Sequence, residues 1–205
     1  MSEQQALWDK EKAEKHARWT KMASRLYYAP FARRIVGNLA PLKRDSKIID
    51  LGTGPGILSI ELNKLLPQVK IIGVDPSGEM LEIARKNADE IGMSNYETRL
   101  GRAKEIPVES NSVDLVVSQF SVHEWEDPPK GFSKIFRILK PDGSFILRDF
   151  NREWFSKWKL HLFKVFITMI GESYEAHLEM FKCTFEGVAA LLKEAGFAEI
   201  KGKGR

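Results

Sequence analysis

The residues best suited to chemistry follow two apolar runs of the chain. Asp50 nearly closes the first run, and Gly52, Gly54 and Gly56 come after it at alternating positions, while Asp75 ends the second run. Glycine lets a backbone turn sharply and lets a ligand approach closely. A carboxylate placed like Asp75 can accept hydrogen bonds from both hydroxyls of a ribose. The pattern therefore predicts a site for a ligand that contains a nucleoside.

The glycine spacing distinguishes between two such ligands. A nicotinamide dinucleotide requires G-x-G-x-x-G and a helix N-terminus free to hold a pyrophosphate. Here the spacing is G-x-G-x-G, and Asp50 precedes it, where a negative charge would repel a pyrophosphate and favour a cation. S-adenosylmethionine carries an ammonium and a sulfonium, has no phosphate, and offers a ribose to Asp75. The residues favour this cofactor, and a nicotinamide-dependent oxidoreductase is the alternative.

The elements that must position these residues alternate between strands and helices. Apolar runs predict strands at 47–51, 69–75, 96–101, 113–120, 144–150 and 197–203. Helical spacing predicts helices after the glycines up to Pro67, from Ser77 to Gly92, from Pro128 to Leu139 and from Thr184 to Gly196, with a turn at 140–143. This alternation predicts an α/β fold whose doubly wound, mainly parallel sheet has helices on both faces.

Two further segments flank this core in what we expect to be a single domain over 1–205. Residues 1–44 are expected to be helical, and the charged run from Lys10 to Lys21 is expected to be a solvated helix face, with a basic surface for RNA or membrane as the alternative. Residues 151–183 are expected to form a helical insertion rich in apolar side chains. We interpret it as a lid, or else as a dimer interface. The cofactor-binding core would span 45–150, and the last helix and strand 184–205.

Composition limits the classes of protein. Hydrophobic content of 43% and charged content of 29% are typical of soluble chains. The net charge of +4 favours anionic partners only weakly, because acidic and basic residues are interleaved. A single cysteine, Cys183, excludes an intrachain disulfide framework and a multi-cysteine metal site. We therefore expect a cytoplasmic protein with no metal site and no membrane partner.

The chain resembles the class I S-adenosylmethionine-dependent methyltransferases, of the small single-domain type that acts on small molecules. The resemblance covers about residues 47–200. Residues 48–56 match the D-x-G-x-G-x-G motif of that family, and 73–85 match its second-strand acid and the following helix. Residues 106–128 and 136–147 match its fourth-strand region and its helix-turn-fifth strand.

The resemblance implies a role for each matching position. Asp50 and the three glycines would surround the methionine part of the cofactor, and Asp75 would hold the ribose. The adenine would lie near Pro76, Met80 and the backbone of Ala103, and the sulfonium near Ser118 and Gln119. The N-terminal segment would contribute Tyr28 or its neighbour Tyr27. Two features depart from the family. Arg102 stands after Gly101 where an acid often contacts adenine, and the chain stops after a candidate sixth strand where a seventh is usual.

Methyl transfer needs in-line placement, and a general base only if the acceptor arrives protonated. His123 and Asp149 are the candidates for that base. His123 could instead tether its loop, which we favour, and Asp149 could cap a helix or pair with Arg148 or Arg152. Enzymes that methylate nucleic-acid bases commonly place an Asn/Asp-Pro-Pro-aromatic motif directly after the fourth strand. Residues 127–130 come too late in this chain and lack the aromatic residue, so we do not expect a nucleic-acid acceptor.

We therefore predict a methyltransferase with a small-molecule acceptor. A catalytically silent cofactor-binding regulatory protein, and an RNA or protein methyltransferase, are the alternatives. Homodimer formation is left open.

Overall fold

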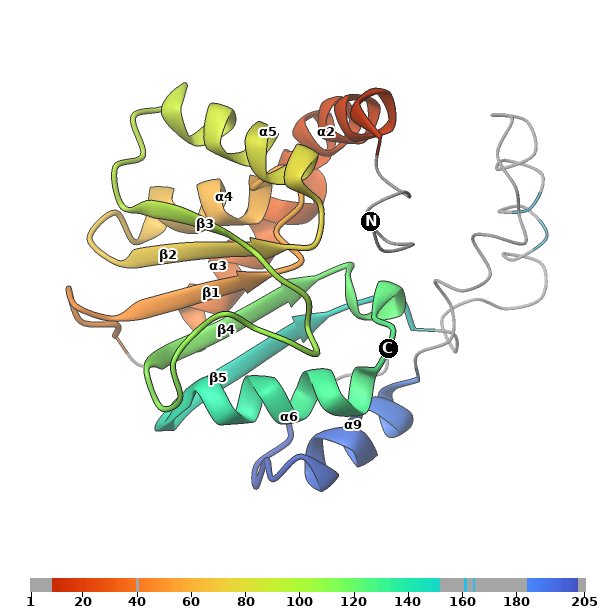
Figure 1. The fold of residues 1–205 in the computed structure, drawn as a ribbon. Coiled ribbons are helices and arrows are strands. Elements are labelled where there is room, and N and C mark those ends of the chain that lie inside the picture. Colours follow the sequence, from red (N-terminus) through yellow and green to blue (C-terminus); the bar gives the residue numbers. More distant parts are fainter. Residues whose placement is uncertain (1–8, 40, 152–160, 162–163, 165–183, 203–205) are drawn as a thin grey trace.

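A parallel β-sheet lies at the centre of the structure, a computed structural model that describes residues 9–39, 41–151, 161, 164 and 184–202 (Figure 1). Within these residues five strands are ordered β3-β2-β1-β4-β5. All neighbouring strands run parallel, as predicted. The strands are β1 (Lys47–Leu51), β2 (Lys70–Asp75), β3 (Tyr96–Leu100), β4 (Val113–Gln119) and β5 (Leu139–Arg148). The chain order reverses between β1 and β4, so a crevice is expected where these two strands end.

Helices cover both faces of the sheet, which confirms the doubly wound architecture (Figure 1). On one face, α3 (Ala29–Gly37), α4 (Ile57–Leu65) and α5 (Gly78–Asp89) pack against a core that includes Ile48 and Leu115. On the other face, α6 (Pro128–Ile138) and α9 (Phe185–Glu194) pack against a core that includes Ile49 and Val116. Adjacent residues of one strand thus enter opposite cores, and this explains why the central strands are continuous apolar runs.

Of the N-terminal segment predicted to be helical over 1–44, residues 10–37 are helical and 41–44 are not. The helical part comprises α2 (Lys10–Ala23), a π-helical turn η1 (Ser24–Tyr28) and then α3. The inner face of α2 is made of small residues, and Ala13, Ala17 and Ala23 are buried. Among the described residues, no helix is both long and apolar enough to cross a membrane.

The predicted helix starts are confirmed by their caps. The Ser77 hydroxyl accepts a hydrogen bond from the backbone N–H of Met80, and Thr184 caps α9 in the same way. The Asp127 side chain caps α6, whose first positions are Pro128 and Pro129. The Asp-Pro-Pro sequence is therefore a helix start, which its fixed backbone geometry suits.

The predicted bounds of β5 were wrong at both ends. β5 begins at Leu139, and the predicted turn at 140–143 is an irregular stretch inside it, because Val113 pairs with Leu139 while Leu115 already pairs with Ser144. β5 also ends at Arg148 rather than at residue 150.

The predicted final strand is not formed over residues 197–202. Phe197 instead packs its ring against those of Phe136 and Phe145, with centroids 5.3 and 6.1 Å apart. Apart from residues 151, 161 and 164, the predicted insertion at 151–183 lies outside the described residues.

Candidate functional site

The glycine loop joins β1 to α4 at the carboxyl end of β1, where the crevice is expected. Gly52, Gly54 and Gly56 all have left-handed backbone angles, with φ of 76°, 50° and 78°. A side-chain carbon at Gly52 would lie 2.4 Å from the Cβ of Ser121, so the loop packs directly on the segment that follows β4. The Gly52 N–H donates to the Val74 carbonyl over 2.8 Å. The loop is thereby fixed to both strands that neighbour β1.

Asp50 is held by the hydroxyl groups of its own loop and helix. Its side chain is buried, and one carboxylate oxygen accepts hydrogen bonds from Thr53 Oγ1 at 2.9 Å and Ser59 Oγ at 2.7 Å. Burial raises the pKa of Asp50, and the two hydroxyl donors oppose that rise. The carboxylate therefore organises the glycine loop from beneath, a role that the sequence did not indicate.

Tyr96 completes this network and was missed by the sequence analysis. Its hydroxyl lies 3.1 Å from Thr53 Oγ1, and burial, followed by the charge of Asp50, raises the pKa of Tyr96. A side-chain carbon at Gly73 would lie 2.3 Å from this hydroxyl, so only glycine leaves room for it. A glycine inside a strand often marks the close approach of another group. Gly73, within the predicted strand at 69–75, is therefore the sequence feature that could have indicated a buried side chain such as Tyr96.

Asp75 lies at the end of β2, beside the glycine loop. One carboxylate oxygen accepts a hydrogen bond from the Gly54 N–H at 2.8 Å, and the other accepts one from the Ser77 N–H at 3.0 Å. Burial raises the pKa of Asp75 to about 6, and the two backbone donors oppose the rise. A carboxylate has about four acceptor positions. Two remain for the hydroxyls of a ligand.

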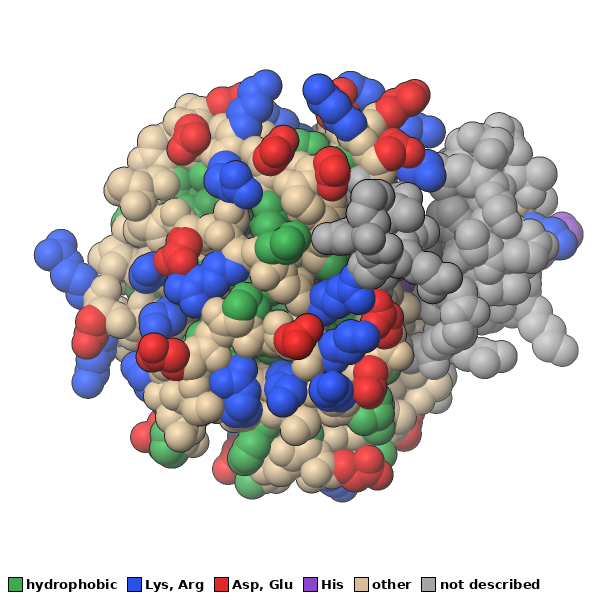
Figure 2. Space-filling model, viewed as in Figure 1, with side chains coloured by type: hydrophobic (Ala, Val, Ile, Leu, Met, Phe, Trp, Pro, Cys, Tyr) green, Lys and Arg blue, Asp and Glu red, His purple; other side chains and the backbone are tan. Residues whose placement is uncertain are grey.

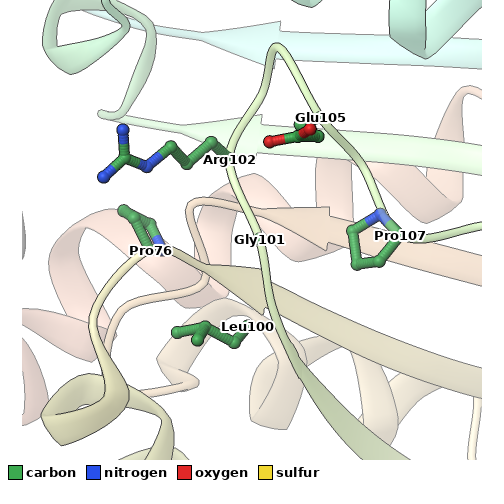
Figure 3. Close-up of a pocket in the computed structure, with 6 residues that line it drawn as sticks. All are labelled: Pro76, Leu100, Gly101, Arg102, Glu105 and Pro107. Atoms are coloured by element: carbon green, nitrogen blue, oxygen red, sulfur yellow. The ribbon is translucent and has the colours of Figure 1, made fainter. Parts of the chain in front are cut away.

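A cavity of about 320 Å³ lies beside Asp75, where β2 and β3 end. In Figure 3, Pro76 and Arg102 extend to the same side of the Gly101 backbone, and the Glu105 carboxylate points back toward it. Arg102 donates to Glu126 over 2.7 Å. The lining residues are Pro76, Leu100, Gly101, Arg102, Glu105 and Pro107. Of the positions predicted to lie near adenine, Pro76 lines this cavity, whereas Met80 is buried and Ala103 packs against the α6-side core.

The end of β4 is polar, buried and strained. Ser118 Oγ lies 2.7 Å from Ser121 Oγ. Gln119 is 6% exposed, and its Nε2 donates to the Tyr27 carbonyl over 3.4 Å. Its Oε1 has no partner, and it is the only buried side-chain nitrogen or oxygen of which this is true among the described residues. Phe120 follows with φ of 55°, an unusual value for a bulky residue and one that tends to occur at functional sites.

His123 and Asp149, both predicted as catalytic candidates, lie together. His123 Nδ1 and Asp149 Oδ1 are 2.8 Å apart, and both side chains are almost fully buried. The other Asp149 oxygen accepts a hydrogen bond from the Val122 N–H at 2.8 Å. Arg148 was considered as a partner for Asp149. It instead donates to the Tyr27 carbonyl at 2.9 Å, with its guanidinium over the rings of Tyr27, Phe31 and Phe120.

The N-terminal segment reaches the same region. Tyr28 packs against the core that contains Ile48 and Leu115. Burial, followed by the charge of Asp50, raises the pKa of Tyr28 to about 12. Tyr27 is 40% exposed and meets Phe120 edge-on, with ring centroids 6.3 Å apart. The segment therefore lies over the ends of β4 and β5.

Known proteins share this fold and sequence pattern. A family model described as "Methyltransferase domain" matches residues 42–195. A structure from Methanococcus maripaludis, assigned as an S-adenosyl-L-methionine-dependent methyltransferase, has a TM-score of 0.72 and 30% identity over 93% of this chain and 86% of that one.

Two curated relatives are also similar to this chain. The uncharacterized methyltransferase YcgJ of Bacillus subtilis is 30% identical over 54% of this chain and 43% of its own length. The ubiquinone/menaquinone biosynthesis C-methyltransferase UbiE of Rickettsia felis is 28% identical over 87% of this chain and 77% of its own. The match with YcgJ thus covers less than half of that relative.

Proposed function

We propose that this chain, which belongs to the family of S-adenosylmethionine-dependent methyltransferases, transfers the methyl group of that cofactor to a small-molecule acceptor. One observation carries the proposal. At the reversal of strand order, the left-handed glycine loop lies between the buried Asp75 carboxylate, which binds the Gly54 N–H, and the segment after β4, where Gln119 keeps an unpartnered oxygen. The family cofactor fits this arrangement, because it offers ribose hydroxyls to Asp75 and an ammonium to Gln119.

We propose the following cofactor contacts. Asp75 holds the ribose, and Pro76 packs on the adenine, with Met80 and Ala103 supporting that part of the site from behind. Gln119 Oε1 accepts a hydrogen bond from the ammonium of the methionine part. That part is further surrounded by Asp50, Gly52, Gly54, Gly56, Ser118 and Tyr28.

We propose that His123 and Asp149 act as a base and its positioning partner. The bound cofactor supplies an electrophilic methyl group on a sulfonium. Asp149 holds the Nδ1 side of the imidazole, so Nε2, which lies 3.6 Å from the exposed Glu124 carboxylate, is the atom that would take a proton from an acceptor hydroxyl or amine. The charge of Asp149 would stabilise the imidazolium that forms. Imidazole is the side chain best suited to this task near neutral pH.

We propose that the acceptor presents a flat, apolar surface. The rings of Phe120 and Phe150 stack with centroids 4.7 Å apart, and His123 meets Phe150 edge-on at 5.7 Å. The aromatic residues next to the proposed base would favour a planar acceptor. The relatives named for ubiquinone/menaquinone biosynthesis and for demethylmenaquinone support this choice.

We place the protein in the cytoplasm, as a single domain whose cofactor-binding core spans 45–150. The lone cysteine supports this location, because disulfide-dependent folding is ruled out. Homodimer formation stays a proposal that a measurement of molar mass in solution will decide.

Titration calorimetry with S-adenosylhomocysteine tests the proposal. We expect saturable binding at one site per chain. The wild-type protein is then supplied with methyl-labelled cofactor and a panel of phenols, quinols, amines and thiols. His123→Asn should bind S-adenosylhomocysteine normally yet lose transfer by roughly 10²–10⁴-fold, the usual contribution of a general base.

Three outcomes would change the assignment. No binding to folded protein would refute the cofactor site. Binding without turnover on any acceptor would favour the catalytically silent alternative. Full activity of His123→Asn would remove the proposed base and leave transfer to depend on placement alone.

A further inference from the structure

The outer face of α2 and η1 exposes large apolar side chains to solvent. Trp19 is 59% exposed, Met22 83% and Leu26 74%. Their spacing of three and four residues places them on one side of the helix, while the inner side is buried through Ala13, Ala17, Thr20 and Ala23. Exposed apolar residues are common singly, but a row of three on one helix face indicates an interaction surface.

The same segment carries the excess positive charge of the chain. Between residues 10 and 25 there are six Lys or Arg and two Glu, a net charge of +4 that equals the net charge of the whole chain. The rest of the chain therefore sums to zero. Figure 2 shows Lys and Arg side chains over α2, with acidic side chains among them. Arg18 and Arg25 lie close in sequence to the three apolar residues and are exposed.

This outer face is continuous with the proposed transfer site. The ring of Trp19 stacks on that of Tyr27, with centroids 6.4 Å apart, and Tyr27 meets Phe120 at 6.3 Å. Phe120 in turn stacks on Phe150, next to His123. A partner seated on the outer face would therefore lie beside the mouth of the crevice.

We propose that the outer face of α2 and η1, formed by Trp19, Met22 and Leu26 with Arg18 and Arg25, seats the protein on an anionic lipid surface. A helix with this pattern lies in the membrane interface, with its apolar side chains among the lipids and its cations at the headgroups. The inference goes beyond the proposed function and does not depend on it. It revises the expectation of a solvated face without a membrane partner.

Two other occupants fit the observations less well. Single-stranded RNA is bound by aromatic side chains that stack on bases. Here the rings of Trp19 and Tyr27 stack on each other, and Met22 and Leu26 offer no ring. A second copy of the chain in a two-fold dimer would place this face on itself, and two segments of net charge +4 would repel each other. An anionic lipid surface would bury the three apolar side chains and attract the positive charge of the segment.

Vesicle sedimentation tests the proposal with the full chain. We expect binding to phosphatidylcholine vesicles that contain phosphatidylglycerol, at least about tenfold stronger than to phosphatidylcholine alone, and weaker at high salt. The variant Trp19→Ser/Met22→Ser/Leu26→Ser should lose binding about tenfold or more. Arg18→Glu/Arg25→Glu should lose the dependence on phosphatidylglycerol.

The control is Leu65→Ser, because Leu65 is 40% exposed at the end of α4, away from the crevice. It should bind vesicles like the wild type. Every variant is compared with the wild type by thermal unfolding and by S-adenosylhomocysteine binding, so that a misfolded protein is recognised. Absence of wild-type vesicle binding would overturn the proposal. So would binding that survives the triple substitution, a preference for single-stranded RNA over vesicles, or a dimer that the triple substitution dissociates.

Discussion

The two sides of the crevice differ in how completely the protein satisfies its own polar groups. On the β1 side, Asp50 is bound by Thr53 and Ser59, and Tyr96 closes the network from β3. On the β4 side, Gln119 keeps an unpartnered oxygen, and Phe120 holds a strained backbone angle. The Asp50 network is complete without a ligand, whereas the β4 side keeps a hydrogen-bond acceptor for one. The cofactor would thus bind beside the preformed Asp50 network and supply the missing hydrogen-bond donor for Gln119.

The β1 side should be the easiest to break. Gly52→Ala combines a left-handed φ with a clash against Ser121, and we expect it to lower the free energy of unfolding by about 3 kcal/mol or more. Gly54→Ala has a similar φ but no atom within 4 Å, so it should cost only about 1–2 kcal/mol. Urea unfolding measures both. Equal losses would show that contact with Ser121 is unimportant.

Asp75 should contribute a large share of ligand binding. Asp75→Ala leaves the ribose hydroxyls without their acceptor, and we expect binding of S-adenosylhomocysteine to weaken by about 1.5–3 kcal/mol, the scale of charged hydrogen bonds. Calorimetry measures the loss. The control is Glu82→Ala, an exposed position on α5, which should change nothing. Unchanged affinity in Asp75→Ala would remove the ribose assignment.

Gln119→Met sharpens the comparison, because its two effects should have opposite signs. The substitution removes a buried oxygen without a partner and also the long 3.4 Å hydrogen bond from Nε2 to the Tyr27 carbonyl, which Arg148 still satisfies. It should therefore raise the free energy of unfolding of the ligand-free protein by about 1 kcal/mol, while binding of S-adenosylhomocysteine weakens by about 1.5–3 kcal/mol. Gln119→Glu keeps an acceptor oxygen and should bind the ligand more tightly than Gln119→Met. A ligand-free protein that is less stable, with unchanged binding, would mean a merely structural role.

The raised pKa of Asp75 predicts a smaller, pH-dependent effect. Asp75 loses its charge as the pH falls through about 6, so S-adenosylhomocysteine binding should weaken there by roughly three- to tenfold. Asp75→Asn should remove this dependence. Calorimetry at several pH values between 5 and 8 checks both proteins. Equal pH profiles would assign the titration to another group.

Stability should change in the opposite sense. Between the ordinary value of 3.8 and about 6, the folded protein binds a proton at Asp75 that the unfolded chain does not. The contribution of Asp75 to stability is therefore most favourable below 3.8 and declines as the pH rises through about 6. The free energy of unfolding of Asp75→Asn, relative to that of the wild type, should therefore increase as the pH rises from 5 to 7. Urea unfolding at the two pH values measures the difference.

Local patterns were enough to predict most of the sheet and the helix starts. β1 coincides with the predicted 47–51, and Ser77, Asp127 and Thr184 cap helices that begin where the sequence indicated. Such features depend on residues close in sequence, so a single chain displays them. The irregular start of β5 depends on its register with β4, which no local pattern encodes.

The side-chain partners in the site were less predictable, because they depend on residues far apart in the chain. Asp50 was expected to favour a cation, yet its carboxylate is bound by hydroxyls, one of which Tyr96 meets from another strand. His123 and Asp149 were separate candidates, and only the fold brings them to hydrogen-bond distance. The sequence likewise did not reveal which apolar residues of α2 face solvent.

The bond from Arg148 to the Tyr27 carbonyl spans 121 residues, and this has a consequence during synthesis. Chains emerge from the ribosome at about 5–20 residues per second, so Tyr27 precedes Arg148 by roughly ten seconds. Over that interval the N-terminal helices are present without β5 and its hydrogen bond to the Tyr27 carbonyl. The contact of these helices with β5 is therefore among the last of the described fold to form, and any chaperone that binds the nascent chain would find Trp19 and Leu26 before β5 exists.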